Sequence, residues 1–431
     1  MASRWSRFVL PALLVAAFPS VVLEAQPFRY LAFGDSITDG FNDHPNCLGC
    51  VGCGYPGRLS TEFGCTGLNC EVVNHGLSGE KTMNGITRLN NLFFAGDPDW
   101  DLMMLMHGSN DIFDDDPVIP EEAVRDNLKQ MAYDAAELGI ETLHASIIWF
   151  HPWGDRGHGR DDEIENLRDL VSVLATSENR SFADAWNLLC PVAGDIHGHP
   201  WAVTGLGCFN QHYCEDDPNG ATQAAQWVLG HPNPSGFDMM SDMFRNTINA
   251  VPAPGLATVV SPSGAECETM PTLSWTKESP DGATWYQAQV ETDLGATVFD
   301  SWLPEADISA VAPDPLIPGV CIGTACSVTL AAALTQGDYV WRVRGRNPKG
   351  RSAFTADAAF SILPASLNLE NDTVADTRVE AACNQVVAGN LGGGDYGVAA
   401  SGNLTLDGGT GVEIHDGFWV ADGGTLNLVS N

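Results

Sequence analysis

Two residues in this sequence have neighbours that suit nucleophilic catalysis. Ser36 follows the apolar run Tyr30–Phe33 and sits in the phrase GDSIT, where glycine and aspartate allow a tight turn. His231 lies far along the chain, directly before a proline. A serine hydroxyl is a poor nucleophile until a base takes its proton, and imidazole has a pKa suited to that task near neutrality. Ser36 and His231 are therefore candidates for the nucleophile and base of an acyl-transfer reaction.

Two further segments carry groups that could stabilise a developing negative charge. Residues 72–82 read VVNHGLSGEKT, an apolar run that enters a turn containing Gly76 and Gly79. Residues 102–111 read LMMLMHGSND, an apolar run followed by Gly108 and Asn110. Glycine lets a backbone N–H approach a reacting carbonyl closely, and an asparagine amide can donate to an oxyanion. Taken alone, the second of these segments is better explained as a plain turn, and the glycines of the first can be read as turn formers only.

These four segments, in this order, resemble the sequence blocks of the GDSL, or SGNH, family of esterases and lipases. GDSIT matches the first block, and the His-Pro-Asn-x-x-Gly phrase that starts at His231 matches the last. The resemblance implies a Ser36 nucleophile, a His231 base, and an oxyanion hole formed by the N–H groups of Ser36 and Gly79 and the amide of Asn110. Gly76 is the alternative to Gly79. The resemblance implies no metal and no organic cofactor.

The sequence departs from the family at the residue that normally orients the histidine. The family has an aspartate three residues before the histidine, and Val228 stands there. Either a backbone carbonyl near Val228 accepts the imidazole Nδ1–H, giving a Ser-His dyad, or a carboxylate from Glu215–Asp217 folds back to do so. We favour the carbonyl, because a neutral acceptor three residues away needs no loop rearrangement.

The expected activity is the hydrolysis of carboxylic esters. A small-molecule or polysaccharide ester is the expected substrate, and short-chain acyl or acetylated carbohydrate esters are favoured, because β-rich modules after a catalytic domain are common companions of carbohydrate-active enzymes. One alternative is a lysophospholipase or lipase of the same family. Another is a glycan-binding or adhesion protein with a degenerate hydrolase domain. This alternative rests on Val228, which replaces the aspartate of the family.

The elements that must position these residues alternate between short apolar runs and amphipathic ones. This alternation predicts a parallel sheet covered by helices on both faces, with the site beyond the carboxyl ends of its strands. The family resemblance, which covers residues 30–250, implies a flavodoxin-like three-layer α/β/α domain. The predicted strands are Tyr30–Phe33, Val72–Asn74, Leu102–Met106, Thr142–Ile148 and Phe182–Asp184. The predicted helices are Pro120–Leu138, Asp161–Ala175 and Pro234–Ala250.

Residues 251–431 have a different sequence pattern, with short apolar runs separated by turn residues. A Val-Pro-Ala-Pro linker at residues 251–254 leads into short strands separated by turns, which predict a β-sandwich for residues 251–364. Its pattern resembles a fibronectin type III module. Residues 365–431 are rich in glycine and repeat an apolar-turn phrase, which predicts a β-coil or small β-sheet module. This module could retain the protein at a cell surface or matrix, or simply cap the chain.

The N-terminus and the cysteines point to export. Arg4 and Arg7 precede an apolar stretch and small residues up to Ala25, so residues 1–25 are predicted to be a secretory signal peptide. The residues from 26 to 250 then form the predicted hydrolase domain. Cysteines are numerous and even in number, which suits disulfides in an oxidising compartment better than a zinc site. We therefore expect a secreted extracellular or periplasmic protein.

Charge restricts the partners. The chain carries 55 acidic against 20 basic residues, a net charge of −35. A polyanion such as nucleic acid would be repelled, so we expect no nucleic-acid partner. No apolar stretch reaches the ~20 residues that a membrane-spanning helix needs, so we expect no transmembrane segment in the mature chain.

Overall fold

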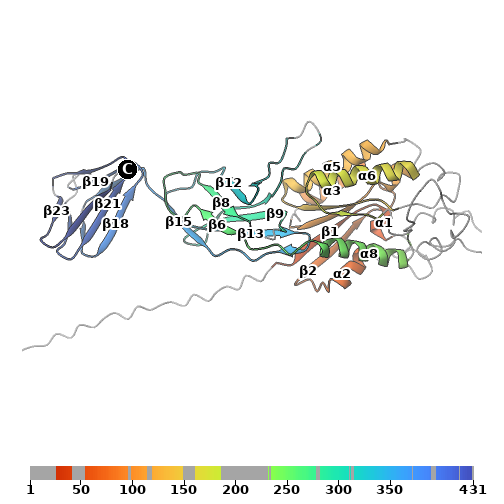
Figure 1. Ribbon diagram of the computed structural model, residues 1–431, viewed down its shortest axis with the longest axis horizontal. Coiled ribbons are helices and arrows are strands. Elements are labelled where there is room, and N and C mark those ends of the chain that lie inside the picture. The colour runs from red at the N-terminus through yellow and green to blue at the C-terminus, as the bar shows by residue number, and fades with distance from the viewer. Residues whose placement is uncertain are drawn as a thin grey trace, which may run out of the picture.

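The structure is a computed structural model. It describes residues 26–40, 54–95, 99–113, 119–148, 161–185, 232, 234–277, 282–309, 311, 315–370, 372–389, 395–416 and 418–429. The predicted signal peptide, Val228, the acidic loop at 215–217 and His231 lie outside the described residues. In Figure 1 the described part forms a row: a helix-rich unit, a β-rich unit, and a second β-rich unit at the C-terminal end.

A five-stranded parallel sheet forms the centre of the first unit, as the alternating pattern predicts. The strand order is β2-β1-β3-β4-β5, and every neighbouring pair is parallel. This is the order of doubly wound sheets in which the chain reverses direction across the sheet at β1 and β3. The strands are β1 Phe28–Gly34, β2 Cys70–Gly76, β3 Leu102–Met106, β4 Glu141–Ala145 and β5 Phe182–Ala183.

Helices cover both faces of this sheet (Figure 1). Successive side chains of a strand point to opposite faces. Accordingly, Tyr30 and Ala32 belong to the core under α2 and α8, while Leu31 and Phe33 belong to the core under α3, α5 and α6. The helices are α1 Ser36–Asp39, α2 Gly54–Glu62, α3 Thr82–Phe94, α4 Ser109–Phe113, α5 Glu121–Glu137, α6 Asp161–Ser177 and α8 Pro234–Ala250.

The predicted elements agree with these bounds to different degrees. The strand Leu102–Met106 and the helix Pro234–Ala250 are confirmed residue for residue. The strand predicted for Thr142–Ile148 ends at Ala145, although the next three residues stay buried. Helix α3 was not predicted, because its sequence contains Gly85 and two adjacent asparagines, which are poor helix formers. Gly85 is needed for packing, since a Cβ there would lie 2.9 Å from Nε2 of His107.

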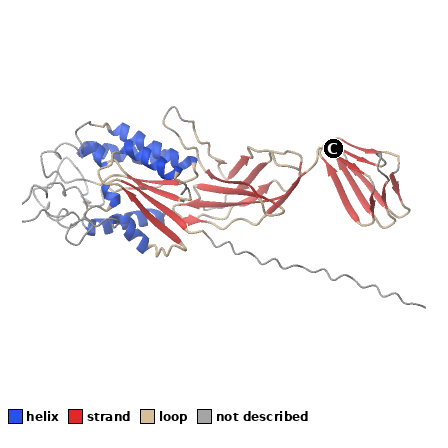
Figure 2. Cartoon of the chain, turned by 180° about the vertical axis from the view of Figure 1, so that it is seen from behind, coloured by secondary structure: helices blue, strands red, loops and turns tan. Residues whose placement is uncertain are grey.

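The second unit contains two sheets with a shared core around Trp275, Tyr286 and Trp341, and their strand pairs are antiparallel except for the parallel pair of β15 and β7. Figure 2 shows that it consists of strands and loops. This confirms a β-rich region consistent with a sandwich, while the resemblance to fibronectin type III stays a prediction. One sheet has the order β10-β9-β13-β15-β7, with β14 on β13, and the other has the order β11-β12-β8-β6. The bounds are β6 Thr258–Ser261, β7 Gly264–Glu266, β8 Thr272–Thr276, β9 Trp285–Thr292, β10 Thr297–Pro304, β11 Cys321–Ile322, β12 Ala325–Thr329, β13 Gly337–Asn347, β14 Gly350–Arg351 and β15 Ala358–Ile362.

The third unit is a coil of three parallel sheets, each with three strands. Every turn of the coil contributes one strand to each sheet, and apolar residues such as Val386, Val398 and Leu404 fill the interior. The repeated apolar-turn phrase thus produces a stacked β-coil. The strands are β16 Ser366–Leu369, β17 Asp372–Val374, β18 Thr377–Ala382, β19 Gln385–Ala388, β20 Tyr396–Val398, β21 Asn403–Gly408, β22 Gly411–Ile414, β23 Phe418–Val420 and β24 Thr425–Val429.

The described cysteines form three disulfides, as the disulfide interpretation predicts. Cys65–Cys70 and Cys321–Cys326 each staple a short loop, and Cys267–Cys383 joins the second unit to the β-coil. The remaining six cysteines lie outside the described residues. Among the helices that the structure describes, none is both long and apolar enough to cross a membrane.

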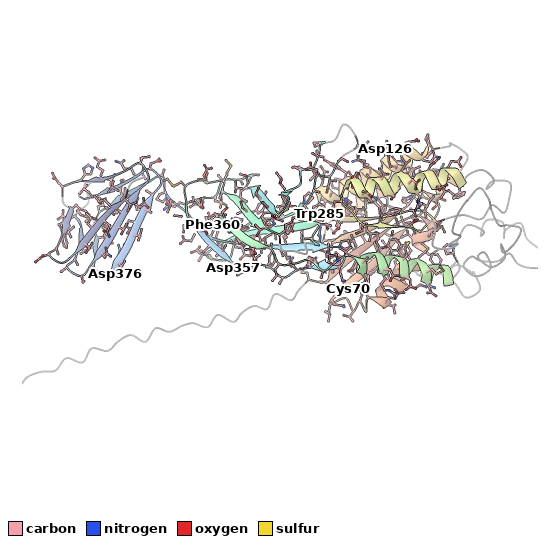
Figure 3. All side chains as sticks on the ribbon, viewed as in Figure 1. Cys70, Asp126, Trp285, Asp357, Phe360 and Asp376 are labelled. Carbon is pink, nitrogen blue, oxygen red and sulfur yellow. A yellow bond between two sulfur atoms is a disulfide. The ribbon has the colours of Figure 1, made fainter. Side chains whose placement is uncertain are left out.

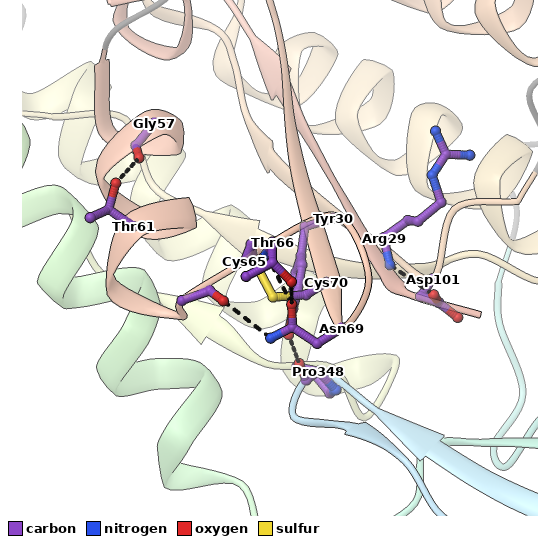
Figure 4. Close-up of a disulfide and its surroundings, with 11 residues drawn as sticks. Arg29, Tyr30, Gly57, Thr61, Cys65, Thr66, Asn69, Cys70, Asp101 and Pro348 are labelled. Carbon is purple, nitrogen blue, oxygen red and sulfur yellow. Dashed lines mark hydrogen bonds between the residues drawn. A yellow bond between two sulfur atoms is a disulfide. The ribbon is translucent and has the colours of Figure 1, made fainter. Parts of the chain in front are cut away.

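The second unit packs against the end of the parallel sheet where the strands begin. Asp101, just before β3, is buried and forms ion pairs with Arg346 and Arg351 of the second unit. Figure 4 shows a neighbouring contact, in which the Tyr30 hydroxyl donates to the carbonyl of Pro348 at 3.4 Å. Trp285, labelled in Figure 3, belongs to an apolar cluster that also contains residues of α5. These contacts with the second unit lie at the amino ends of the strands and not at their carboxyl ends.

Glu141, the first residue of β4, makes this interface sensitive to pH. Its fully buried carboxylate accepts a hydrogen bond from Thr284 Oγ1 at 2.6 Å. Burial raises the pKa of Glu141 to about 7, against the opposing effects of Arg346 and of the Thr284 bond. A carboxyl group with a raised pKa stabilises the fold most below its ordinary pKa of about 4.3, and that stability is lost as the pH rises to about 7.

We therefore predict that Glu141→Gln flattens the fall in melting temperature between about pH 4.5 and 7.5. The carboxyl group contributes a change on the order of 3 kcal/mol over this range, or roughly 5–10 °C. Differential scanning fluorimetry across the pH range measures it. Glu137→Gln, which changes an exposed carboxylate on α5, is the control and should keep the wild-type slope. An unchanged slope in Glu141→Gln would contradict the assignment.

Candidate active site

Three loops meet at the carboxyl end of the sheet. Residue pairing places Gly34, the last residue of β1, beside Gly76 of β2 and Met106 of β3. The loops that follow these strands therefore start side by side. This is the point where the strand order reverses, which is where open α/β sheets bind ligands. The predicted residues Ser36, Gly79 and Asn110 come one from each loop.

The first loop is a tight turn that presents Ser36 as the first residue of α1. The Asp35 side chain caps this short helix by accepting from the Ile37 N–H at 3.1 Å, and its other oxygen accepts from the Ser109 N–H at 3.2 Å. Gly34 is required before the turn, because a Cβ there would lie 2.0 Å from the carbonyl oxygen of Met106. The backbone around Ser36 is thus held by both neighbouring elements, with only 7% of the residue exposed.

The two candidate glycines of the second loop have different environments. The N–H of Gly76 donates to Asn74 Oδ1 at 2.9 Å, and a Cβ at Gly76 would lie 1.9 Å from the backbone nitrogen of Asp39. Gly79 is exposed, has a positive φ of 78°, and has open space where a Cβ would be. Among the described residues, no hydrogen bond from the Gly79 N–H is found. Ser78 connects this loop to the first by donating to Asp39 Oδ2 at 2.8 Å.

The third loop begins helix α4 and presents Asn110. The Asn110 side-chain amide donates to the carbonyl oxygen of Glu80 at 2.9 Å, which ties the third loop to the second. Asp111 reinforces the tie by accepting from both the N–H and the Oγ1–H of Thr82, at 2.9 and 2.7 Å. Burial raises the pKa of Asp111, although the Thr82 hydrogen bonds oppose this effect. The three loops are therefore connected to one another by direct hydrogen bonds.

A buried polar group lies beneath these loops, and the sequence analysis assigned it no role. Glu80 is 6% exposed and contacts both Arg88 of α3 and His107 at the end of β3. Nδ1 of His107 accepts from the Gly108 N–H at 2.9 Å, so Nε2 carries the proton and donates to Glu80 at 3.1 Å. Burial would raise the pKa of Glu80, but hydrogen bonds from His107 and Arg88 outweigh it and lower that pKa.

These residues carried a weak signal in the sequence. Glu80 and His107 lie inside the second and third blocks, yet a charged residue in a polar turn is usually exposed. Arg88 lies on a helix that was itself not predicted. The base candidate His231 and the position of Val228 cannot be compared with the site, because both lie outside the described residues. Within the described ranges, no group of three or more His, Cys, Asp or Glu side chains is arranged to hold a metal ion.

Comparison with known proteins gives a family match and several remote structural similarities. Residues 32–239 match the model of the GDSL-like lipase/acylhydrolase family. No curated protein sequence matches the chain. A GDSL-like lipase from Bacteroides thetaiotaomicron VPI-5482 is 18% identical, with 52% of this chain and 92% of that chain covered and a TM-score of 0.34.

Two further solved structures show similar values. A variant of an acetyl xylan esterase from Geobacillus stearothermophilus is 20% identical, with coverage of 51% of this chain and 94% of that chain and a TM-score of 0.35. The SGNH-hydrolase family esterase AlinE4 is 19% identical, with coverage of 42% and 94% and a TM-score of 0.31. At these values the similarities carry no information about substrate.

The different environments of the two glycines give a direct prediction. Gly76→Ala should destabilise the protein by about 3 kcal/mol or more, because its Cβ meets the backbone of Asp39 and backbone cannot move aside. Gly79→Ala should cost only about 1 kcal/mol, which is the cost of a positive φ. Melting temperatures should therefore fall by roughly 6–12 °C and 2–4 °C respectively. Equal losses for the two variants would contradict the geometry.

Proposed function

Because residues 32–239 are a domain of the GDSL-like lipase/acylhydrolase family, we propose that this protein is a serine esterase with Ser36 as its nucleophile. The observation that carries the proposal is the set of hydrogen bonds that joins the three loops. Asp35 to Ser109 joins the first loop to the third, and Asn110 to Glu80 joins the third to the second. A fixed nucleophile surrounded by fixed donors is what acyl transfer requires.

The oxyanion hole is assigned to the N–H groups of Ser36 and Gly79 and the amide of Asn110. Gly79 is preferred to Gly76 because its environment is open, whereas the Gly76 N–H already donates to Asn74. The Asn110 amide has two hydrogens. One is donated to Glu80, which orients the group and leaves the other for the substrate oxygen.

The reaction proceeds in two acyl-transfer steps. His231 takes the Ser36 proton as the hydroxyl oxygen attacks the ester carbonyl, and the resulting oxyanion accepts hydrogen bonds from the three donors. His231 then gives this proton to the leaving alcohol, which forms an acyl-serine. Water, deprotonated by His231, attacks the acyl-serine and releases the acid, and the proton returns to Ser36. Orientation of His231 is assigned to a backbone carbonyl near Val228, with a carboxylate of residues 215–217 as the alternative.

Short-chain acyl esters or acetylated carbohydrates are the proposed substrates. The β-rich region after the hydrolase domain supports a polysaccharide setting, as such modules accompany carbohydrate-active enzymes. The three disulfides support export to an oxidising compartment, in agreement with the proposed signal peptide. In this setting the C-terminal β-coil would retain the enzyme at a cell surface or matrix.

We predict that the full chain hydrolyses p-nitrophenyl acetate faster than the butyrate and octanoate esters, and that it releases acetate from acetylated xylan. Ser36→Ala should lower every rate by at least about 1,000-fold, because the acyl-serine cannot form. Initial rates measure both expectations. The control is Ser172→Ala, which removes a half-buried serine of α6 in the same domain and should leave the rates unchanged.

Two outcomes would overturn parts of this proposal. If Ser36→Ala retains activity, Ser36 is not the nucleophile. A clear preference for the octanoate ester would favour a lipase or lysophospholipase.

A further inference from the structure

The guanidinium group of Arg88 reaches from α3 across the carboxyl ends of two strands. It donates to the carbonyl oxygens of His75 at 2.8 Å and Gly34 at 3.1 Å, near the last residues of β2 and β1. It also binds the Glu80 carboxylate in a forked arrangement, with Nε to Oε1 at 2.8 Å and Nη2 to Oε2 at 2.6 Å. The ring of Phe33 lies 4.0 Å from its central carbon. One side chain thus connects two strand ends to the second loop.

Glu80 continues this connection to the remaining loop. Its carboxylate accepts from His107 at the end of β3, and its backbone carbonyl accepts from the Asn110 amide. Its own chain neighbour is Gly79. The proposed function assigns three donors to the oxyanion hole: the N–H groups of Ser36 and Gly79 and the Asn110 amide. Glu80 lies between the last two of them. A displacement of Glu80 would move both groups.

The same two strands carry a similar ion pair at their other end. Nε of Arg29 lies 3.0 Å from Oε2 of Glu71, and the Arg29 guanidinium covers the ring of Trp100 at 4.0 Å. Both pairs join a partly buried arginine to a carboxylate and an aromatic ring. Only the pair of Arg88 and Glu80 contacts the loops at the carboxyl end. The chain thus contains a comparable but more exposed ion pair on the same two strands, which serves as a control for effects that do not pass through the site.

We infer that Arg88 and Glu80 are positioning residues, whose ion pair sets the distance and orientation between the Gly79 N–H and the Asn110 amide. This inference rests on the proposed function for its catalytic consequence, although the positioning itself is a structural claim. Donors that are already aligned stabilise the transition state without reorganisation, and small displacements are costly in rate. Neither residue needs to touch the substrate.

Two variants test the catalytic consequence on the full chain. Arg88→Lys keeps the charge but loses the fork, and Glu80→Gln keeps the backbone carbonyl that holds Asn110. Each should lower kcat for p-nitrophenyl acetate by about 10- to 100-fold, with KM changed by less than about 3-fold, at a temperature well below both melting transitions. The kcat of the double variant should be about that of the more damaging single variant, because both substitutions disrupt the same ion pair.

Arg29→Lys and Glu71→Gln are the matched controls. They should lower the melting temperature by less than the site variants do, because the Glu71 side chain is 45% exposed and that of Glu80 only 5%, while kcat stays within about 2-fold of wild type. If they reduce kcat as much as the site variants do, or if the site variants leave kcat unchanged, Arg88 and Glu80 contribute stability alone and the inference is overturned.

A second readout does not depend on activity. In amide NMR spectra of the full chain, Arg88→Lys should shift the Gly79 N–H and Asn110 side-chain signals, and should speed exchange of the Asn110 amide hydrogen that is bonded to Glu80 by at least about 10-fold, whereas Arg29→Lys should do neither. Unaffected signals would overturn the positioning claim even in an active enzyme. An inactive wild type with affected signals would instead overturn the proposed function and leave the positioning claim supported.

Discussion

The pairing of β1 between β2 and β3 is the constraint on which the site depends. It places Gly34 in register with Gly76 and Met106, so that three loops leave the sheet at one level. The close approach of these strands and loops leaves no room for a Cβ at Gly34 or Gly76. Hydrogen bonds between the loops then hold the backbone around Ser36. Strand register thus brings the three loops together, and side-chain hydrogen bonds between the loops then fix the site.

The sequence was sufficient for those parts that follow from local pattern. The five apolar runs became the five parallel strands, because buried strands of a doubly wound sheet are continuously apolar. The repeated apolar-turn phrase after residue 365 became a three-sheet coil, in which strands such as β21 alternate between buried and less buried residues. The placement of Ser36, Gly79 and Asn110 on neighbouring loops followed from the rule that parallel strands end at one edge. The strands and the coil needed only the period and order of residues, whereas the choice of Ser36, Gly79 and Asn110 came from the resemblance to the GDSL family.

The sequence was insufficient where a contact joins distant residues. Nothing local to Asp101 indicates that it binds Arg346 and Arg351, some 250 residues later. Likewise, Arg88 and Glu80 are ordinary charged residues until the fold brings them under the loops. Such pairs depend on burial and on the approach of separate elements, which periodicity does not encode. The two ends of the sheet are therefore both held by arginine–carboxylate contacts, one toward the second unit and one toward the site.

The most direct test of the central claim is to identify the residue that reacts with a fluorophosphonate probe. The full chain is incubated with the probe and digested, and the labelled peptide is sequenced by mass spectrometry. The account predicts one phosphonate per chain, on Ser36, and no label after denaturation, because the reactivity depends on the folded site. Label on another serine, or no label on a folded protein, would contradict it.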